Sequence, residues 1–394
     1  MIVFTFPGQG SQKPGMGEPW REHPSWELVV EASSVLGRDL EALLLHTDAD
    51  ELKLTDNAQL STFLTSLVVL DAVERLGVEP AAAAGHSLGE YTALVASGAL
   101  AFDDGLRLVA ERGAAMRQAA TARTGTMAAV LGLDDDDVEV ACARVDGDVW
   151  VANYNAPGQV VIAGEPEAVA EASAAAKELG AKKVMPMAVS GAFHTPLMAP
   201  ARERLRKAID AAELREAELP VYANVDARPH SDGVEWSGLL AAQLCSPVRW
   251  RQTLERLGEG GASYLVELGP GNVLTGMAKR TVKGATTLAV STPDDLDKLL
   301  TALATPEVAE VAEVVVHQGE HLFATERMVV SPAAGVFVPA DGVDTGLQLV
   351  PGTVLGRVGD QEVRSPFAGL LVGMLAVDGE RVTTSQPIAW LRTA

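Results

Sequence analysis

The chain has 394 residues and a hydrophobic content of 47%, enough for a large buried core, so we expect two or three domains. Its formal net charge of -22 argues against binding to nucleic acid or to an anionic membrane surface. The two cysteines, Cys142 and Cys245, are too few for a disulfide framework and lack metal-ligand spacing, so no metal site is predicted. We find no signal peptide and no apolar run long enough to span a bilayer, and therefore expect a cytoplasmic protein.

The first part of the chain alternates strand-like and helix-like patterns. Residues 1–6 indicate a buried strand, which ends in the glycine-rich turn PGQGSQ at 7–12. This turn lacks the G-K-[ST] of a phosphate-binding loop, and it fits a loop whose backbone N–H groups approach a ligand oxygen. Helical patterns follow at 26–45 and 59–76, and a strand at 78–84 leads into the segment that carries the chemistry.

That segment is Gly85-His86-Ser87-Leu88-Gly89, a G-x-S-x-G pattern between the strand and a helical pattern at 90–99. Strand, sharp turn and helix are the context of a nucleophile elbow, in which the Ser87 hydroxyl is exposed at the turn. The N-terminus of the following helix offers free N–H groups beside that hydroxyl, where a developing oxyanion would be stabilised. The pattern is short in a chain with 37 glycines, so by itself it leaves an ordinary tight turn open.

The sequence pattern in the middle of the chain predicts a small subdomain inserted into a larger domain. A helix at 103–120 carries Arg112, and from 123 to 190 the order is strand, helix, strand, strand, helix, strand. This order is typical of a small ferredoxin-like unit, which we interpret as an insertion in a large α/β domain. After the insertion, the patterns predict helices at 200–212 and near 236–244, strands at 221–224 and 264–268, and a short helix ending near 279.

A nucleophilic serine needs a base within hydrogen-bond reach. Of the seven histidines, His194 is the best candidate, because it lies among small and aromatic residues at the end of a strand-like run. His86 adjoins Ser87, but local geometry points its ring away.

The C-terminal part differs in kind. The sequence SPAAG at 331–335 returns as SPFAG at 365–369, and each copy precedes short strand-like runs. Two similar halves predict a small all-β barrel-sandwich domain at 313–394, joined by a linker at 293–312.

The chain resembles the malonyl-CoA:acyl carrier protein transacylases, including the stand-alone acyltransferases that serve polyketide synthases. The resemblance covers about residues 1–290 and implies an α/β-hydrolase-like domain with a parallel sheet at 1–122 and 191–292, with the ferredoxin-like subdomain at 123–190. It rests on seven motifs in the family's order: FPGQGSQ at 6–12, GHSLGE at 85–90, ERGAAM at 111–116, NYNAPGQVVIAG at 153–164, GAFH at 191–194, SPVRW at 246–250 and ELGPGNVLTG at 267–276.

The resemblance implies transfer of a malonyl group from malonyl-CoA to the phosphopantetheine thiol of an acyl carrier protein, through an acyl-serine and without a metal or redox cofactor. Ser87 matches the nucleophile and His194 the general base and acid. A backbone carbonyl orients the imidazole in this family, and the matching position is Arg249. Gln9 and Leu88 match the positions whose backbone N–H groups form the oxyanion hole.

Three further residues are expected to contact the substrate. Arg112 matches the arginine that binds the malonyl carboxylate, a task suited to a planar, bidentate guanidinium; a surface salt bridge with Glu111 is the alternative. Phe193 would crowd a substituent on the malonyl C2, which favours malonyl over methylmalonyl. Asn153 and Asn155 either line the site or only cap a turn.

Two rival activities remain open from the sequence: a hydrolase that clears acyl groups from carrier proteins, and a transferase for a different acyl group. Because carrier proteins of this kind are acidic, we expect a local basic patch that binds the carrier protein. The candidates are Arg202, Arg204, Arg206 and Lys207, with Lys182 and Lys183 before the His194 segment.

The C-terminal domain resembles a biotinyl or lipoyl domain over about residues 326–394. Those domains present a lysine at the tip of a hairpin, whereas the matching stretch at 357–362 has none. No lysine follows Lys298 at all, so biotin or lipoate cannot be attached by the usual amide. An interaction or packing module is therefore predicted.

Overall fold

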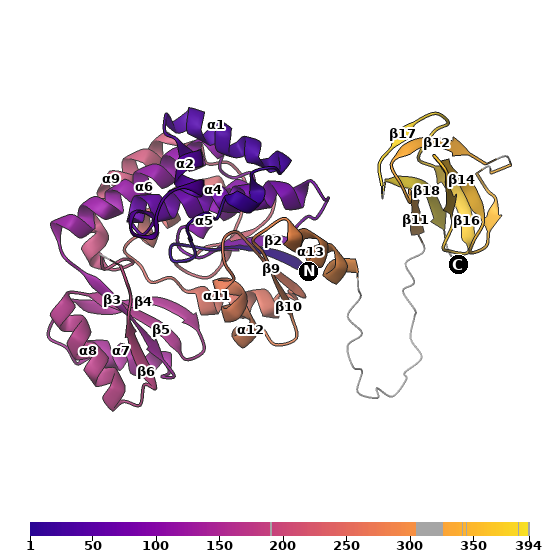
Figure 1. Cartoon of the computed structure of the whole chain (residues 1–394). Helices are drawn as coiled ribbons and strands as arrows, with labels where there is room; N and C mark the ends of the chain where they lie inside the picture. Colours follow the sequence, from indigo (N-terminus) through magenta and orange to yellow (C-terminus); the bar gives the residue numbers. More distant parts are fainter. Residues whose placement is uncertain (190, 305–325, 341, 344, 385, 393–394) are drawn as a thin grey trace, which may run out of the picture. The chain divides into compact units, whose positions relative to one another are not determined.

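The computed structural model describes residues 1–189, 191–304, 326–340, 342–343, 345–384 and 386–392. The chain divides into two compact units, residues 1–307 and 308–394, which are described separately below (Figure 1). Among the described residues, no helix has the length and apolarity needed to cross a membrane. The cytoplasmic location stays a prediction.

A six-stranded sheet forms the centre of the first unit. Its strand order is β10-β9-β1-β2-β7-β8, and every pair is parallel except β7 with β8. Parallel strands are usually buried on both faces, which explains the nearly continuous apolar runs IVFTF and AAAG in the two central strands. The strands are β1 (Ile2–Phe6), β2 (Ala82–Gly85), β7 (Val221–Tyr222), β8 (Pro229–His230), β9 (Tyr264–Leu268) and β10 (Thr286–Val290).

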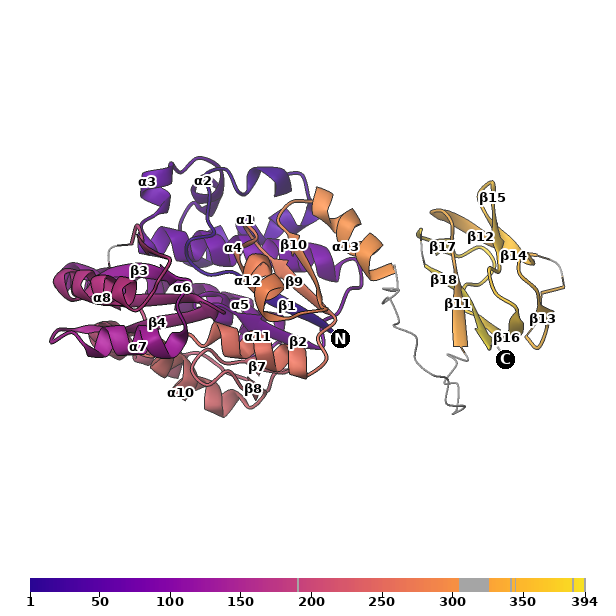
Figure 2. The ribbon, with the colours of Figure 1, turned by 90° about the horizontal axis from the view of Figure 1, so that it is seen from below.

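Helices cover both faces of this sheet (Figures 1 and 2). Phe4 and Phe6 face a large core with α4, α5 and α6, whereas Val3 faces a second core with α11 and α12. This alternation follows from the two-residue period of a strand. The helices of the unit's large domain are α1 (Glu27–Leu36), α2 (Leu40–Leu45), α3 (Ala49–Leu52), α4 (Thr55–Glu74), α5 (Gly89–Ala96), α6 (Phe102–Ala122), α9 (Ala199–Ala211), α10 (Gly233–Gln243), α11 (Trp250–Glu259), α12 (Val273–Thr281) and α13 (Asp294–Ala304), with 3-10 turns at Glu18–Trp20, Pro24–Trp26 and Pro196–Met198.

Two predicted boundaries need correction. The single helix predicted at 26–45 is two helices, because Gly37 adopts a left-handed φ of 59° after α1 and ends it. The linker predicted at 293–312 begins too early, because residues 294–304 form α13 and its Leu299 is buried in the main core. The remainder of that linker, and the start of the predicted C-terminal domain up to residue 325, lie outside the described residues.

A small subdomain is inserted between α6 and α9. Its elements follow the predicted order of strand, helix, strand, strand, helix, strand, and its sheet order is β4-β5-β3-β6 with all pairs antiparallel. The helices α7 and α8 contact each other and the sheet, and their apolar residues form a separate core. The elements are β3 (Thr126–Leu131), α7 (Asp135–Ala143), β4 (Val149–Ala156), β5 (Gln159–Gly164), α8 (Pro166–Glu178) and β6 (Lys183–Pro186).

The second unit contains two four-stranded sheets, β11-β18-β16-β13 and β15-β14-β12-β17, whose pairs are antiparallel. The sequence repeat has a structural counterpart. Ser331 Oγ donates to the Ala333 carbonyl at 2.6 Å, and Ser365 Oγ donates to the Phe367 carbonyl at 2.8 Å. The strands are β11 (Glu326–Val330), β12 (Gly335–Pro339), β13 (Gln348–Leu349), β14 (Val354–Val358), β15 (Gln361–Arg364), β16 (Gly369–Met374), β17 (Arg381–Val382) and β18 (Pro387–Arg392).

Candidate active site

The G-x-S-x-G segment forms a tight turn between β2 and α5. Ser87 has a φ of 53°, in the left-handed region that a non-glycine residue seldom adopts. Both flanking glycines are sterically required. A Cβ on Gly85 would lie 1.9 Å from the Gly89 carbonyl group, and one on Gly89 would lie 2.0 Å from the Phe6 carbonyl oxygen. The strained turn exposes the Ser87 hydroxyl at the carboxyl end of a parallel strand, where α/β sheets usually bind their ligands.

His194 lies against this hydroxyl, as the sequence predicted. Its Nε2 is 2.7 Å from Ser87 Oγ, and its Nδ1 is 2.9 Å from the carbonyl oxygen of Gln243. A carbonyl can only accept a hydrogen bond, so the Nδ1 carries the proton and the Nε2 is left as the acceptor for the serine hydroxyl. His194 itself has a φ of 60°, and two strained residues in contact are typical of a functional site.

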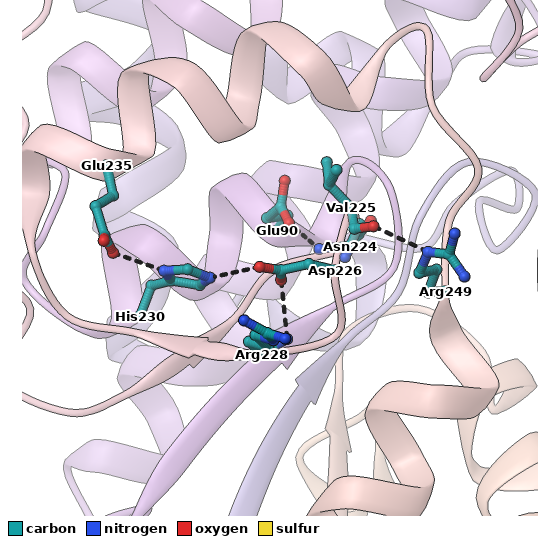
Figure 3. Close-up of polar contacts among 8 residues, drawn as sticks. All are labelled: Glu90, Asn224, Val225, Asp226, Arg228, His230, Glu235 and Arg249. Carbon is teal, nitrogen blue, oxygen red and sulfur yellow. Dashed lines mark hydrogen bonds and ion pairs between the residues drawn. The ribbon is translucent and has the colours of Figure 1, made fainter.

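The carbonyl that orients His194 belongs to Gln243, and the prediction of Arg249 was wrong. The Arg249 carbonyl accepts the N–H of Thr253 in the first turn of α11. The Arg249 guanidinium donates to the Val225 carbonyl at 3.0 Å (Figure 3). Gln243 is the last residue of α10, and the last carbonyls of a helix lack partners within it. The end of α10 therefore supplies the free acceptor that the start of α11 cannot.

Arg112 is buried, with 1% of its surface exposed, beside the same hydroxyl. Its Nη2 lies 3.1 Å from Ser87 Oγ and 2.9 Å from Gln243 Oε1, and its Nη1 lies 2.6 Å from Gln59 Oε1. The alternative of a salt bridge with Glu111 fails, because Glu111 pairs with Arg204. Within the described part of the chain, no carboxylate oxygen lies within 4.0 Å of the Arg112 guanidinium. This buried cation is held by neutral groups and has no close counter-ion.

The electrostatics keep His194 in its neutral form. Burial, and after it the nearby charge of Arg112, lower the pKa of His194 to about 3, against the opposing effect of its bond to the Gln243 carbonyl. A neutral imidazole can accept the proton of Ser87 over the whole physiological pH range.

The sequence analysis missed a buried polar network beneath the elbow. Asn224, two residues after β7, accepts the N–H of Ser87 at 2.7 Å with its side-chain oxygen and donates to the Gly85 carbonyl at 2.7 Å. Glu90 accepts the backbone N–H of Asn224 at 2.6 Å, as Figure 3 shows, and the side-chain amide of Gln243 at 2.6 Å. The only sequence signal was an acidic residue, Glu90, in a helix that must be buried.

The loop after Asn224 is fixed by a second set of contacts. His230 Nδ1 lies 2.6 Å from Glu235, and its Nε2 lies 3.1 Å from Asp226 (Figure 3). Burial lowers the pKa of His230, but the two carboxylates outweigh it, so the net shift is upward and the ring is favoured as a cation. These ion pairs anchor the loop that carries Asn224 to α10.

A cavity of about 310 Å³ opens over Ser87 and His194. It is mainly apolar, and both Phe193 and Gln9, which the sequence analysis singled out, line it. Asn153 and Asn155 also line it; Asn155 is held by His86, whose Nε2 lies 2.8 Å from its Oδ1. Five methionines contribute to the wall: Met116, Met127, Met185, Met187 and Met277. The cavity lies between the large domain and the small subdomain, so the insertion completes the site.

Two backbone N–H groups near Ser87 are unused. Leu88 is the N-cap residue of α5, and neither its N–H nor that of Gln9 has an acceptor among the described residues. Both positions were predicted to form an oxyanion hole. Free donors beside a nucleophilic oxygen can stabilise negative charge that develops on a substrate carbonyl.

Known proteins resemble the first unit over nearly its whole length. Residues 3–315 match the family described as "Acyl transferase domain". The malonyl CoA-acyl carrier protein transacylase of Bacillus subtilis is 42% identical over 307 residues, which cover 77% of this chain and 97% of the relative. The crystal structure of an acyl carrier protein S-malonyltransferase from Vibrio cholerae is 41% identical with a TM-score of 0.73, covering 76% of this chain and 99% of that one. A malonyl-transacylase solved in complex with its type II polyketide synthase acyl-carrier protein is 39% identical with a TM-score of 0.74, with coverages of 76% and 99%.

Proposed function

We propose how this chain, which belongs to the acyl transferase family of the malonyl-CoA:acyl carrier protein transacylases, performs its reaction. The enzyme transfers a malonyl group from malonyl-CoA to the phosphopantetheine thiol of an acyl carrier protein. The observation that carries the mechanism is the contact of one hydroxyl, Ser87 Oγ, with both the His194 imidazole at 2.7 Å and the Arg112 guanidinium at 3.1 Å.

In the first half-reaction, His194 Nε2 takes the Ser87 proton while Oγ attacks the thioester carbon of malonyl-CoA. A bond forms between Oγ and the malonyl carbon, the carbon–sulfur bond breaks, and the departing sulfur takes the proton from His194. In the second half-reaction, the carrier thiol gives its proton to His194 and its sulfur bonds to the malonyl carbonyl carbon. The bond between that carbon and Ser87 Oγ breaks, and Oγ recovers its proton from His194. The backbone N–H groups of Gln9 and Leu88 stabilise the oxyanion in both halves.

Arg112 binds the free carboxylate of the malonyl group. A malonyl ester on Ser87 would carry that carboxylate only two carbons beyond the ester carbonyl, within reach of a guanidinium that already contacts Oγ. A buried cation without a close counter-ion is costly unless an anion joins it, so the site favours an acyl group that ends in a carboxylate. Phe193 lines the same cavity and crowds a C2 substituent, which favours malonyl over methylmalonyl.

Intact-mass analysis after mixing with malonyl-, methylmalonyl- and acetyl-CoA tests this mechanism. We expect one malonyl adduct on the wild-type chain and none on Ser87→Ala, whose fold can be checked by circular dichroism. Subsequent addition of holo-carrier protein should remove the adduct and load the carrier. Release of free malonate at the same rate without carrier would instead favour a hydrolase.

The carrier is proposed to dock near the cavity mouth, on α12. Two of the six cations predicted to form a patch around α9 are engaged in ion pairs, Arg204 with Glu111 and Arg206 with Asp210. By contrast, α12 lines the cavity with Val273, Leu274 and Met277 and carries cations at its end. Lys279, Arg280 and Lys283 have no carboxylate partner in the described residues, and Arg280 donates to Gln159 on the cavity wall. Unpaired cations beside the entrance suit an acidic partner.

The second unit is proposed to be a biotinyl- or lipoyl-like module without its acceptor lysine. The repeated Ser-Pro turns and the two antiparallel sheets support this, since each sheet takes two strands from each half of the repeat. The hairpin between β14 and β15 turns at Gly359 and Asp360 and offers no amine. Co-expression with biotin and lipoate ligases should leave the mass of the chain unchanged.

A further inference from the structure

Gln243 is the residue that connects the three groups of the site. Its backbone carbonyl holds His194, its amide oxygen holds Arg112 Nη2 at 2.9 Å, and its amide nitrogen donates to the Ser87 carbonyl at 2.7 Å. An amide can also be turned over, which would exchange its oxygen and nitrogen. The turned amide would direct an NH2 group at the Arg112 guanidinium and an oxygen at the Ser87 carbonyl, so both contacts would become repulsive.

Glu90 is placed to prevent that reversal. It is fully buried, at 0% exposure, in the first turn of α5, three residues after Ser87. One carboxyl oxygen accepts the backbone N–H of Asn224 and the other accepts the amide nitrogen of Gln243, each at 2.6 Å. Both neighbours are donors. A carboxylate, whose two oxygens can only accept hydrogen bonds, matches this environment. Burial raises the pKa of Glu90 to about 8, and the two donors and Arg112 oppose the shift. Each carboxyl oxygen faces a donor and, among the described residues, neither faces an acceptor for a carboxyl proton, so the hydrogen-bond geometry favours the ionised form.

We propose that Glu90 is a positioning residue whose carboxylate fixes the side-chain amide of Gln243, so that the amide oxygen holds Arg112 ready for the malonyl carboxylate. This proposal rests on the function proposed above, in which Arg112 binds that carboxylate. Glu90 does not line the cavity over Ser87. It acts on acyl-group selectivity through Gln243, in addition to supporting the elbow through Asn224.

The substitution Glu90→Gln tests the proposal, because the new side chain has nearly the same shape but only one acceptor oxygen. That oxygen cannot serve both donors. The backbone N–H of Asn224 cannot turn over, so the new NH2 group should face the Gln243 amide nitrogen and displace that amide, either by moving it away or by turning it over. In either case the guanidinium of Arg112 would lose its amide acceptor.

The measurement is the rate of Ser87 loading from malonyl-CoA and from acetyl-CoA, which has no free carboxylate. We expect the malonyl-to-acetyl rate ratio of Glu90→Gln to fall roughly tenfold, the size of one lost charge-assisted hydrogen bond. The matched control is Glu267→Gln, another fully buried glutamate of the large domain, which bonds Thr275 on α12 and not Arg112. Its malonyl-to-acetyl ratio should stay at the wild-type value even if both rates fall.

Two further variants keep the test decisive. Gln243→Met removes the amide but keeps the backbone carbonyl for His194, and it should lower the ratio as Glu90→Gln does, even if the latter does not fold. Adding Glu90→Gln to Gln243→Met should lower the ratio no further, because the two residues act in series. A wild-type ratio in Glu90→Gln or in Gln243→Met, or an independent further fall in the double variant, overturns the proposal. An unchanged ratio in Arg112→Ala would instead refute the proposed carboxylate binding, so the two failures are distinguishable.

Discussion

Replacing Arg112 by alanine removes the group that we propose to distinguish a malonyl from an acetyl thioester by charge. In the resting enzyme the guanidinium makes hydrogen bonds of 2.6, 2.9 and 3.1 Å to Gln59, Gln243 and Ser87 and lies over the Tyr91 ring at 5.4 Å. The substitution leaves two amide oxygens without a donor and opens a cavity. Some loss of stability is therefore expected, at about 1–3 kcal/mol for each unpaired buried group.

The effect on selectivity is larger and specific. A hydrogen bond to a charged group contributes about 1.5–3 kcal/mol, so its loss should slow malonyl loading of Ser87 roughly 10- to 150-fold. Acetyl loading loses no such contact. The charge of Arg112 also lowers the pKa of His194, so its removal makes the imidazole a somewhat stronger base, although burial still keeps the pKa low. Acetyl loading should therefore be equal or faster.

The assay is quenched-flow loading of Ser87 followed by intact-mass detection, with both donors and with thermal melting to verify the fold. Arg117→Ala, on the solvent-exposed part of the same helix, is a suitable control because its side chain is 54% exposed and pairs only with Asp56. It should leave the malonyl-to-acetyl ratio unchanged. An equal fall of both rates in Arg112→Ala would mean that Arg112 has a structural role only.

The remaining predictions concern pH, the carrier and the second unit. Because the pKa of His194 lies near 3, the imidazole stays neutral as the pH falls, so Ser87 loading should change less than about twofold between pH 7.5 and 5.5; a base with an ordinary pKa of 6.5 would slow it about tenfold. Charge reversal of Lys279 on α12 and of Lys283 just after it should raise the KM for carrier protein at low salt and spare loading from malonyl-CoA, and reversal on α9 should have less effect; the opposite order would favour the α9 patch. A chain that ends at Ala304 should fold and load Ser87 at the full rate, since α13 and the whole sheet remain; aggregation or loss of loading would mean that the catalytic unit needs the second one.

The sequence by itself determined the local structural features of this protein. A G-x-S-x-G segment between small apolar residues and a helical pattern is sufficient to predict the Ser87 elbow, because the steric demand for Gly85 and Gly89 acts within a few residues. The inserted subdomain was predictable for the same reason, since its order of strands and helices follows from hydrophobic periodicity. The repeat of the second unit, SPAAG at 331–335 and SPFAG at 365–369, can likewise be recognised in the sequence.

The family resemblance also pointed to side chains that the structure brings together, although their roles stay predictions. His194 and Arg112 both lie at Ser87 Oγ, because an imidazole and a guanidinium are the side chains that such a site requires. The prediction that was wrong concerned Arg249, whose expected role depended only on its backbone carbonyl. A carbonyl has no signature in the sequence, and whether it is free depends on where α10 ends and α11 begins.

The tertiary structure alone decided which distant groups share a hydrogen bond. Gln243 meets Glu90, Ser87 and Arg112 across separations of 153, 156 and 131 residues, and Asn224 reaches the elbow across 137. Amides and buried carboxyls carry no local pattern that marks them as parts of one network. They are brought together only when the parallel sheet and its covering helices pack, because that packing places the ends of β2, β7 and α10 at one edge of the sheet.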